Sequence, residues 1–188
     1  MKMAVTNQKK TRDPRKPSRV RVEISAGGIV FRRTPKGVRL AFIMDPYGKW
    51  TFAKGHPEAG ESIVDAAVRE TREEMGLGRL KVVKPVGKID IWFRDRYRPE
   101  TKGMLVHKHV HYFLMEAPAH AKGRPQFKEK IRKIIWVPAS RAPDTSSYKD
   151  VRPVLDRVLQ HFSRQRPPQA RRPAGPAPAA SRPAEGQA

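Results

Sequence analysis

The fold of this chain is decided by residues 55–77, which read GHPEAGESIVDAAVRETREEMGL. A glycine-rich turn opens this stretch, and a run without helix breakers follows it over residues 63–75. Ser62 offers a side-chain oxygen to the exposed N–H groups of a first helical turn. Gly76 stands where helices often end in the left-handed conformation. The stretch therefore predicts a helix over residues 63–75.

The predicted helix has an apolar face and an acidic face. At about 3.6 residues per turn, the residues that share the mostly apolar stripe are Val64, Val68, Thr71 and Met75. The residues that lie outside that stripe, around the helix from it, include Ala66, Ala67, Glu70, Glu73 and Glu74. The spacing of the three glutamates, i, i+3 and i+4, places their carboxylates on one side of one turn.

Three carboxylates on one turn repel one another, so a cation among them would stabilise the helix. Hard oxygen ligands suit Mg²⁺ or Mn²⁺, and Mg²⁺ shares its remaining positions with water and substrate phosphates. Arg69 precedes Glu73 by one helical turn and can hold that carboxylate from the side. The alternative is an acidic face open to solvent, with Arg69 as an ordinary surface partner.

The spacing of the whole stretch resembles the box of the Nudix hydrolases, GX5EX7REUXEEXGU. The matching residues are Gly55, Glu61, Arg69, Glu70, Glu73, Glu74, Gly76 and Leu77. Thr71 stands where U asks for a bulky aliphatic residue. The resemblance covers residues 22–162 and implies the fold class α/β, as a Nudix α/β/α sandwich with a mixed β-sheet.

The same resemblance implies a metal-dependent enzyme that acts on nucleoside diphosphates linked to another group. The implied ligands of Mg²⁺ or Mn²⁺ are Glu70, Glu73 and Glu74. Glu73 serves as ligand or general base, and Arg69 and Glu61 complete the catalytic set, with Glu61 as a supporting acid. Many Nudix enzymes carry another acidic ligand in a later loop, where Glu129 is the nearest acidic residue of this chain.

Residues 50–61, WTFAKGHPEAGE, look like the loop of the Nudix enzymes that cleave diadenosine polyphosphates, in which Pro is usual at the place of Ala53. By that resemblance Lys54 and His56 contact the phosphate chain, and Gly55 lies between them in the substrate-binding loop. A lysine and a histidine on a glycine turn beside a metal helix are also well placed to neutralise phosphate oxygens. The alternatives are a surface lysine and a turn histidine.

Strands are predicted on both sides of the acidic helix. They span residues 20–31, 38–44, 50–52, 80–83, 86–93, 106–115 and 131–137, and a second helix spans residues 149–164. Gly27 and Gly28 indicate either a bulge in the first strand or the close approach of another backbone or a ligand. Lys84 and Pro85 separate two of the strands.

Residues 106–115 alternate strictly between two faces. His107, His109 and His111 share one face and suggest a transition-metal site, but neighbours on one strand face sit about 7 Å apart, which disfavours convergence. The run that contains Tyr112 matches the central strand of the diadenosine polyphosphate enzymes. Tyr112 is therefore a candidate for stacking on adenine, with a core or rim tyrosine as the alternative.

The chain of 188 residues carries a net charge of +22 and has no cysteine, which excludes disulfides and thiol catalysis. Residues 1–20 form a basic tail and residues 165–188 a tail rich in Pro, Ala and Arg, both predicted to be disordered, around a Nudix domain at 21–164. The positive charge attracts nucleotide polyphosphates, and RNA binding by the tails is a further hypothesis. We expect no membrane span and no secretory signal, and a cytoplasmic protein by default.

Three functions remain open at this point. The first is hydrolysis of dinucleoside polyphosphates, such as diadenosine tetra- to hexaphosphate, to ATP or related nucleotides. The second is a pyrophosphohydrolase of RNA 5′ ends, of another polyanion such as diphosphoinositol polyphosphate, or of another substrate linked to a nucleoside diphosphate. The basic tails favour the RNA version. The third is a nucleotide- or RNA-binding Nudix protein that does not hydrolyse, which the clustered carboxylates disfavour.

Overall fold

A mixed sheet of seven strands runs through the computed structural model, which describes residues 20–96 and 98–165. The strands are β1 (Val20–Thr34), β2 (Gly37–Met44), β3 (Trp50–Thr51), β4 (Ala53–Gly55), β5 (Lys81–Arg94), β6 (Leu105–Glu116) and β7 (Lys133–Pro138). The main order is β3-β2-β1-β6-β5, with β4 paired to β1 and β7 to β2. The pairing of β1 with β6 is parallel and the others are antiparallel, so the sheet is mixed as predicted. The predicted tails lie outside the described residues, apart from Val20 and Gln165.

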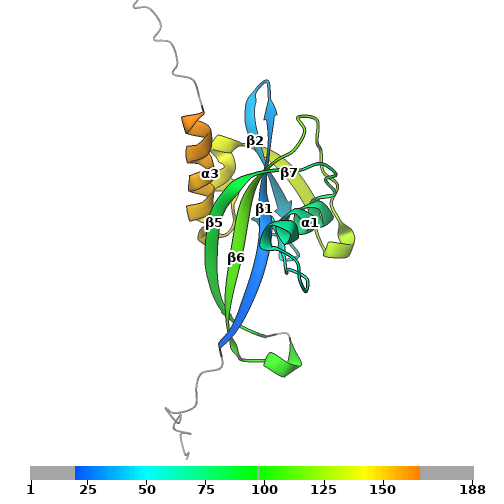
Figure 1. Ribbon diagram of the computed structural model, residues 1–188, viewed down its shortest axis with the longest axis vertical. Helices are drawn as coiled ribbons and strands as arrows, with labels where there is room; N and C mark the ends of the chain where they lie inside the picture. Colours follow the sequence, from blue (N-terminus) through cyan, green and yellow to red (C-terminus); the bar gives the residue numbers. More distant parts are fainter. Residues whose placement is uncertain (1–19, 97, 166–188) are drawn as a thin grey trace, which may run out of the picture.

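Two helices cover opposite sides of this sheet (Figure 1), which confirms the predicted sandwich. The α-helices are α1 (Ile63–Met75), the short α2 (Ala142–Thr145) and α3 (Arg152–Arg164), and the 3-10 turns are η1 (Pro99–Thr101), η2 (Phe127–Glu129), η3 (Ala139–Arg141) and η4 (Lys149–Val151). The predicted second helix thus begins with the turn η4. Over residues 20–96 and 98–165, every helix falls short of the length and apolarity that a bilayer span requires.

The core has one apolar cluster on each face of the sheet. On the α3 side, Phe31, Phe42 and Leu155 belong to a buried group that also contains Tyr112. On the α1 side, the buried group includes residues from the helix and from the facing strands, among them Ala66, Ala67, Met75, Val30 and Met115. Beyond both helices, β1, β5 and β6 continue toward the lower end of the molecule in Figure 1. This extension leaves strand side chains uncovered next to α1.

The boundaries of α1 follow from local capping, as predicted. Ser62 accepts a hydrogen bond from the backbone N–H of Asp65, and Gly76 ends the helix with φ of 57°. The buried face of α1 only partly follows the predicted apolar stripe, because Ala66 and Ala67 are fully buried together with Thr71 and Met75, whereas Val64 and Val68 are half-buried. Small side chains at these two positions let α1 approach the sheet closely.

Gly27 and Gly28 lie at a close approach of other chain segments, and β1 is paired with β6 without a bulge from Val20 to Phe31. A Cβ at Gly27 would lie 2.0 Å from the carbonyl oxygen of Ala53. A Cβ at Gly28 would lie 2.6 Å from the Thr71 hydroxyl, which belongs to α1. Of the two interpretations of this glycine pair, the close approach of backbone is therefore correct.

The predicted break at Lys84 and Pro85 was wrong, because β5 continues through them. The pairing of β5 with β6 shifts register between Val82 and Lys84, and again between Pro85 and Gly87. Proline lacks the N–H that a regular ladder needs, and a bulge on an edge strand is a place that tolerates it.

Candidate functional site

The turn between β4 and α1 positions the start of the acidic helix. Gly55 ends β4, and the turn closes with a hydrogen bond from the N–H of Glu61 to the carbonyl oxygen of Glu58 at 3.0 Å. The Glu61 carboxylate in turn accepts the N–H of Glu58 at 2.9 Å. Gly60 has φ of 79°, which suits glycine in this tight turn. Glu61 is thereby fixed in front of the helix.

Arg69 holds the acidic residues of this region together. Its Nε and Nη2 donate to the two carboxylate oxygens of Glu61 at 2.9 and 2.8 Å, a bidentate pair. Its Nη1 donates to Glu70 and to Glu73, both at 3.0 Å, and Nη2 also reaches the carbonyl oxygen of His56 at 3.0 Å. One planar guanidinium therefore orients three carboxylates and the preceding loop.

The same contacts shift the acid–base equilibria of the pair. The hydrogen bonds to Glu61, and after them those to Glu70, raise the pKa of Arg69. The hydrogen bond from Arg69, followed by the backbone hydrogen bond of Glu58, lowers the pKa of the Glu61 carboxyl. Both shifts favour the charged forms, so the ion pair stays intact at neutral pH.

The Glu70 carboxylate lies against the backbone of Gly55. A Cβ at Gly55 would sit 2.0 Å from Cδ of Glu70 and 2.1 and 2.2 Å from its two oxygens. Only glycine leaves room for this carboxylate, and the Glu70 side chain is 14% exposed. The glycine therefore forms a cradle that keeps a charged oxygen pair at the seam between β4 and α1.

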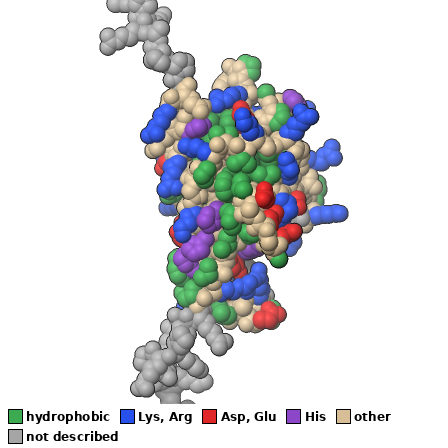
Figure 2. Space-filling view, in the orientation of Figure 1, with side chains coloured by type: hydrophobic (Ala, Val, Ile, Leu, Met, Phe, Trp, Pro, Cys, Tyr) green, Lys and Arg blue, Asp and Glu red, His purple; other side chains and the backbone are tan. Residues whose placement is uncertain are grey.

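Glu74 and Glu73 complete the acidic turn. Glu74 Oε2 accepts the backbone N–H of Lys54 at 3.0 Å, so this carboxylate also faces β4. Glu73 is more accessible, with 49% of its side chain exposed. Carboxylate oxygens are the donors that Mg²⁺ and Mn²⁺ prefer, and the excess of acids over the single arginine leaves negative charge for a cation to balance. In Figure 2, acidic and basic side chains gather together over α1. The donor chemistry of these residues fits a divalent metal.

Two residues of the predicted substrate loop, His56 and Lys54, lie next to β1. His56 Nδ1 lies 2.8 Å from the carbonyl oxygen of Ile24, and its Nε2 lies 4.0 Å from Glu23. Gly27 is the cross-strand partner of both Lys54 and Tyr112, so these two side chains share the sheet face opposite α1. Lys54 is half-buried on that face.

Lys108, which the sequence interpretation did not single out, lies on the same sheet face as Lys54 and is paired in register with Glu23. Burial lowers the pKa of Lys108, and the nearby Lys54 lowers it further. Glu23 is 9% exposed on its side chain and lies 3.3 Å from Arg98. A lysine within the apolar row of residues 106–114 was the sequence signal for this group. The charges of Lys54 and Glu74 both act on Lys108.

Tyr112 does not present a ring face to a nucleotide in this structure, which corrects its assignment as an adenine-stacking residue. It is 1% exposed, and its ring packs edge-on against Phe52 with centroids 6.2 Å apart. Burial raises the pKa of its hydroxyl, and the charge of Glu74 raises it further. An aromatic ring in the apolar row of a central strand is buried by the helix packed above it, here α3.

The structure brings two of the three histidines of β6 together. His107 and His109 meet at Asp90 of β5, whereas His111 lies outside that group. Their ring centroids are 4.1 Å apart, closer than the strand spacing predicts. The backbone of Glu129, the candidate for a fourth acidic ligand, lies in η2, and its side chain lies outside the described part of the structure.

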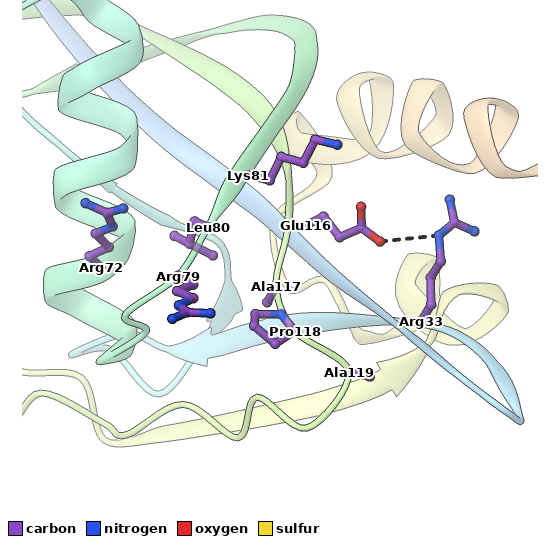
Figure 3. Close-up of a pocket in the computed structure, with 9 residues that line it drawn as sticks. All are labelled: Arg33, Arg72, Arg79, Leu80, Lys81, Glu116, Ala117, Pro118 and Ala119. Atoms are coloured by element: carbon purple, nitrogen blue, oxygen red, sulfur yellow. Dashed lines mark ion pairs between the residues drawn. The ribbon is translucent and has the colours of Figure 1, made fainter.

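A separate pocket of about 450 Å³ lies beside the C-terminal end of α1 (Figure 3). Arg72 and Arg79 line one wall, and Arg33, which pairs with Glu116 at 3.3 Å, lies on the other. None of the acidic residues held by Arg69 lines this pocket. The chemistry of the acidic turn is therefore located at the seam with β4 and not here.

Comparison with known proteins agrees with this geometry. A family model described as the NUDIX domain matches residues 24–162. The putative mutator protein MutT4 of Mycobacterium tuberculosis is 33% identical over 159 residues, which are 79% of this chain and 60% of that protein. The chain thus spans less than two thirds of the length of that relative.

Two further proteins share parts of the sequence or the fold. An RNA pyrophosphohydrolase of Shewanella frigidimarina is 28% identical over 126 residues, covering 61% of this chain and 70% of that protein. The crystal structure of an Ap4A hydrolase binary complex from C. elegans superimposes with a TM-score of 0.60 at 19% identity, over 75% of this chain and 98% of that chain. At this identity the structural likeness establishes the fold alone.

Proposed function

The chain belongs to the Nudix family, and we propose that it is a metal-dependent pyrophosphohydrolase that cleaves a phosphoanhydride bond in dinucleoside polyphosphates. The products would be ATP or related nucleotides. The observation that carries this proposal is the acidic turn of α1, in which Arg69 binds Glu70, Glu70 lies against Gly55, and Glu74 accepts the N–H of Lys54. The catalytic domain in this proposal occupies residues 21–164.

Each residue of the acidic turn has a separate task in the proposed reaction. A divalent ion, Mg²⁺ or Mn²⁺, held by Glu70 and Glu74 would neutralise the pyrophosphate and make a bound water more acidic. Glu73, the most exposed of the three, acts as a further ligand or as the general base that takes the proton of the attacking water. Arg69 keeps the carboxylates in register, and Glu61 keeps Arg69 in place.

The substrate phosphates are proposed to lie along the cations beside Glu74. Lys54 and Lys108 share one sheet face. The negative charge of a polyphosphate chain would offset the repulsion between these two ammonium groups. His56 is placed to contact a phosphate oxygen with Nε2, because its Nδ1 is engaged by the Ile24 carbonyl. The resemblance of residues 50–61 to the diadenosine polyphosphate enzymes supports this substrate class.

A second candidate is a pyrophosphohydrolase of RNA 5′ ends. The net charge of +22 favours an RNA substrate, since phosphate contacts dominate affinity for nucleic acids. The third candidate, a binding protein without hydrolysis, leaves the clustered carboxylates without a purpose.

The test is hydrolysis of three substrate classes by the full-length protein with Mg²⁺: diadenosine polyphosphates, 5′-triphosphorylated RNA and nucleoside triphosphates. We expect the diadenosine compounds to have the highest kcat/KM, and preference for the RNA would establish the second candidate instead. Glu74→Gln should lower turnover by about 1,000-fold or more while the fold survives, and activity within about tenfold of the wild type would refute the assignment. Asp156→Asn, which changes a half-exposed carboxylate of α3 that pairs with Arg152, is the control and should keep wild-type activity.

A further inference from the structure

A group of metal-ligating side chains lies on β5 and β6, outside the acidic turn of α1. Asp90 of β5 is the cross-strand partner of His109, and its neighbour on the same face of β6 is His107. Asp90 Oδ1 lies 3.0 Å from Nε2 of His107 and 2.5 Å from Nδ1 of His109. One ligand atom from each residue lies within 4.8 Å of the others. The three side chains therefore converge on one point.

We propose that Asp90, His107 and His109 form a second metal site, which takes a transition-metal ion of the imidazole-preferring class, Zn²⁺ in particular. Nothing in the proposed hydrolysis uses these residues. Their donor set of two imidazoles and one carboxylate differs from the all-carboxylate set of α1, so the two sites select different ions. Three protein ligands leave a fourth position of a tetrahedral Zn²⁺ for water or an external ligand.

The distances are compatible with coordination after small rotations of the side chains. Zn²⁺ binds imidazole nitrogen and carboxylate oxygen at about 2.0–2.2 Å, so two ligand atoms of a tetrahedral site are about 3.3 Å apart. The carboxylate oxygen of Asp90 is already close to both nitrogens, at 3.0 and 2.5 Å. The rings of His107 and His109 lean toward each other, with centroids 4.1 Å apart.

The surroundings hold the ligands and leave the site accessible. The Trp92 ring stacks on His107 with centroids 3.8 Å apart and an angle of 12°, which restricts that imidazole. The Asp90 side chain is 44% exposed, so an ion can enter from solvent. Figure 2 shows histidine side chains gathered over β5 and β6, on the face of the molecule that this view presents.

Lys88 is the competitor of a metal ion at this place. Its Nζ lies 3.6 Å from Asp90 Oδ1 and 3.4 Å from His109 Nδ1. Without a metal, these contacts form a hydrogen-bonded network of an aspartate, two histidines and a lysine. The proposal therefore predicts that Lys88→Met tightens metal binding, because the substitution removes the competing charge and keeps a similar volume.

The direct test is titration of the full-length, chelator-treated protein with Zn²⁺, followed by competition with a chromophoric chelator. His107→Ala and Asp90→Ala should each weaken Zn²⁺ binding by at least about tenfold, because even mutations of residues beside a metal ligand weaken binding by that much. His111→Ala, on the same strand face but outside the group, and Glu74→Gln, in α1, should leave the Zn²⁺ affinity unchanged. Circular dichroism of each variant without metal checks that its fold is intact, and His107→Gln repeats the test with a more conservative change.

Trp92 supplies an independent readout of where the ion binds. A paramagnetic probe, Cu²⁺, at this site should quench the fluorescence of the wild type, and Trp92→Phe should lose most of the quenching while it still binds the ion. Co²⁺ bound here should show the visible absorption of a four-coordinate site with nitrogen ligands, and His109→Ala should abolish it. Zn²⁺ binding that is equally tight in the wild type and in His107→Ala, or quenching that persists in Trp92→Phe, would overturn the proposal.

Discussion

Replacing Gly55 by alanine should separate catalysis from folding in this protein. The added Cβ would lie 2.0 Å from Cδ of Glu70, whereas carbon atoms in contact keep about 3.5–4.0 Å apart. The Glu70 carboxylate must therefore move by roughly 1.5–2 Å. The φ angle of Gly55 is not positive, so alanine fits the backbone, and only the end of a flexible side chain has to give way.

The expected loss follows from that displacement. A misplacement of about 1 Å at a reacting centre costs about 100-fold, so Gly55→Ala should lower kcat/KM by at least about 100-fold, which is about 2.7 kcal/mol of transition-state stabilisation. The free energy of unfolding should change by less than about 1 kcal/mol, as for other changes that spare the core.

Steady-state hydrolysis and urea unfolding of the same preparations measure the two effects. Gly78→Ala is the matched control, because nothing lies within 4 Å of its added Cβ and its φ is not positive. In a Glu70→Gln background, Gly55→Ala should cause little further loss, since both changes act on one carboxylate. Wild-type turnover in Gly55→Ala, or a full additional loss in the Glu70→Gln background, would refute the reasoning.

Four further predictions concern neighbouring contacts. Gly27→Ala should lower the free energy of unfolding by about 1–3 kcal/mol in urea titrations, because its Cβ meets the backbone oxygen of Ala53, and a stable variant would contradict the close packing of β1 on β4. Arg69→Lys keeps the charge but loses the bidentate contact with Glu61, so kcat should fall by about 100-fold, and unchanged kcat would count against this role. Arg69 lowers the pKa of Glu61 in the folded state, so this ion pair stabilises the fold above the ordinary glutamate pKa and loses its effect as pH falls through the lowered value. The difference in unfolding free energy between the wild type and Glu61→Gln should therefore shrink from about pH 7 to about pH 3. A difference that stays constant over this range would contradict the prediction. Lys108→Met should raise KM for a dinucleoside polyphosphate by about tenfold with a smaller change in kcat. Lys102 is exposed, so Lys102→Met should leave KM and kcat unchanged. Equal kinetic constants for the two variants would show that Lys108 does not contact the substrate.

The sequence predicted best what depends on local chemistry. Ser62 and Gly76 set the ends of α1 through capping, and both ends agree with the structure residue by residue. The spacing of Arg69 and Glu73 likewise predicts a contact within one helical turn, which the structure has at 3.0 Å. Such interactions involve atoms a few residues apart, so their geometry follows once the helix forms.

What the sequence could not predict depends on register between distant segments. Asp90 meets His109 because β5 and β6 pair with a particular offset, which two bulges in β5 help to set. Lys108 becomes a neighbour of Lys54 through the pairing of β1 with both β6 and β4. The burial of Tyr112 required knowing that α3 covers that face. Alternation assigns a side chain to a face, but only the packed fold decides what covers the face.

The most direct test of the metal-binding role of the acidic turn is Mn²⁺ binding to the full-length protein, followed by electron paramagnetic resonance. We expect Mn²⁺ to bind the wild type and His107→Ala equally well, to bind Glu74→Gln at least about tenfold more weakly, and to be displaced by Mg²⁺. Equal Mn²⁺ affinity of the wild type and Glu74→Gln would contradict the claim that the carboxylates of this helical turn are gathered to hold a divalent ion.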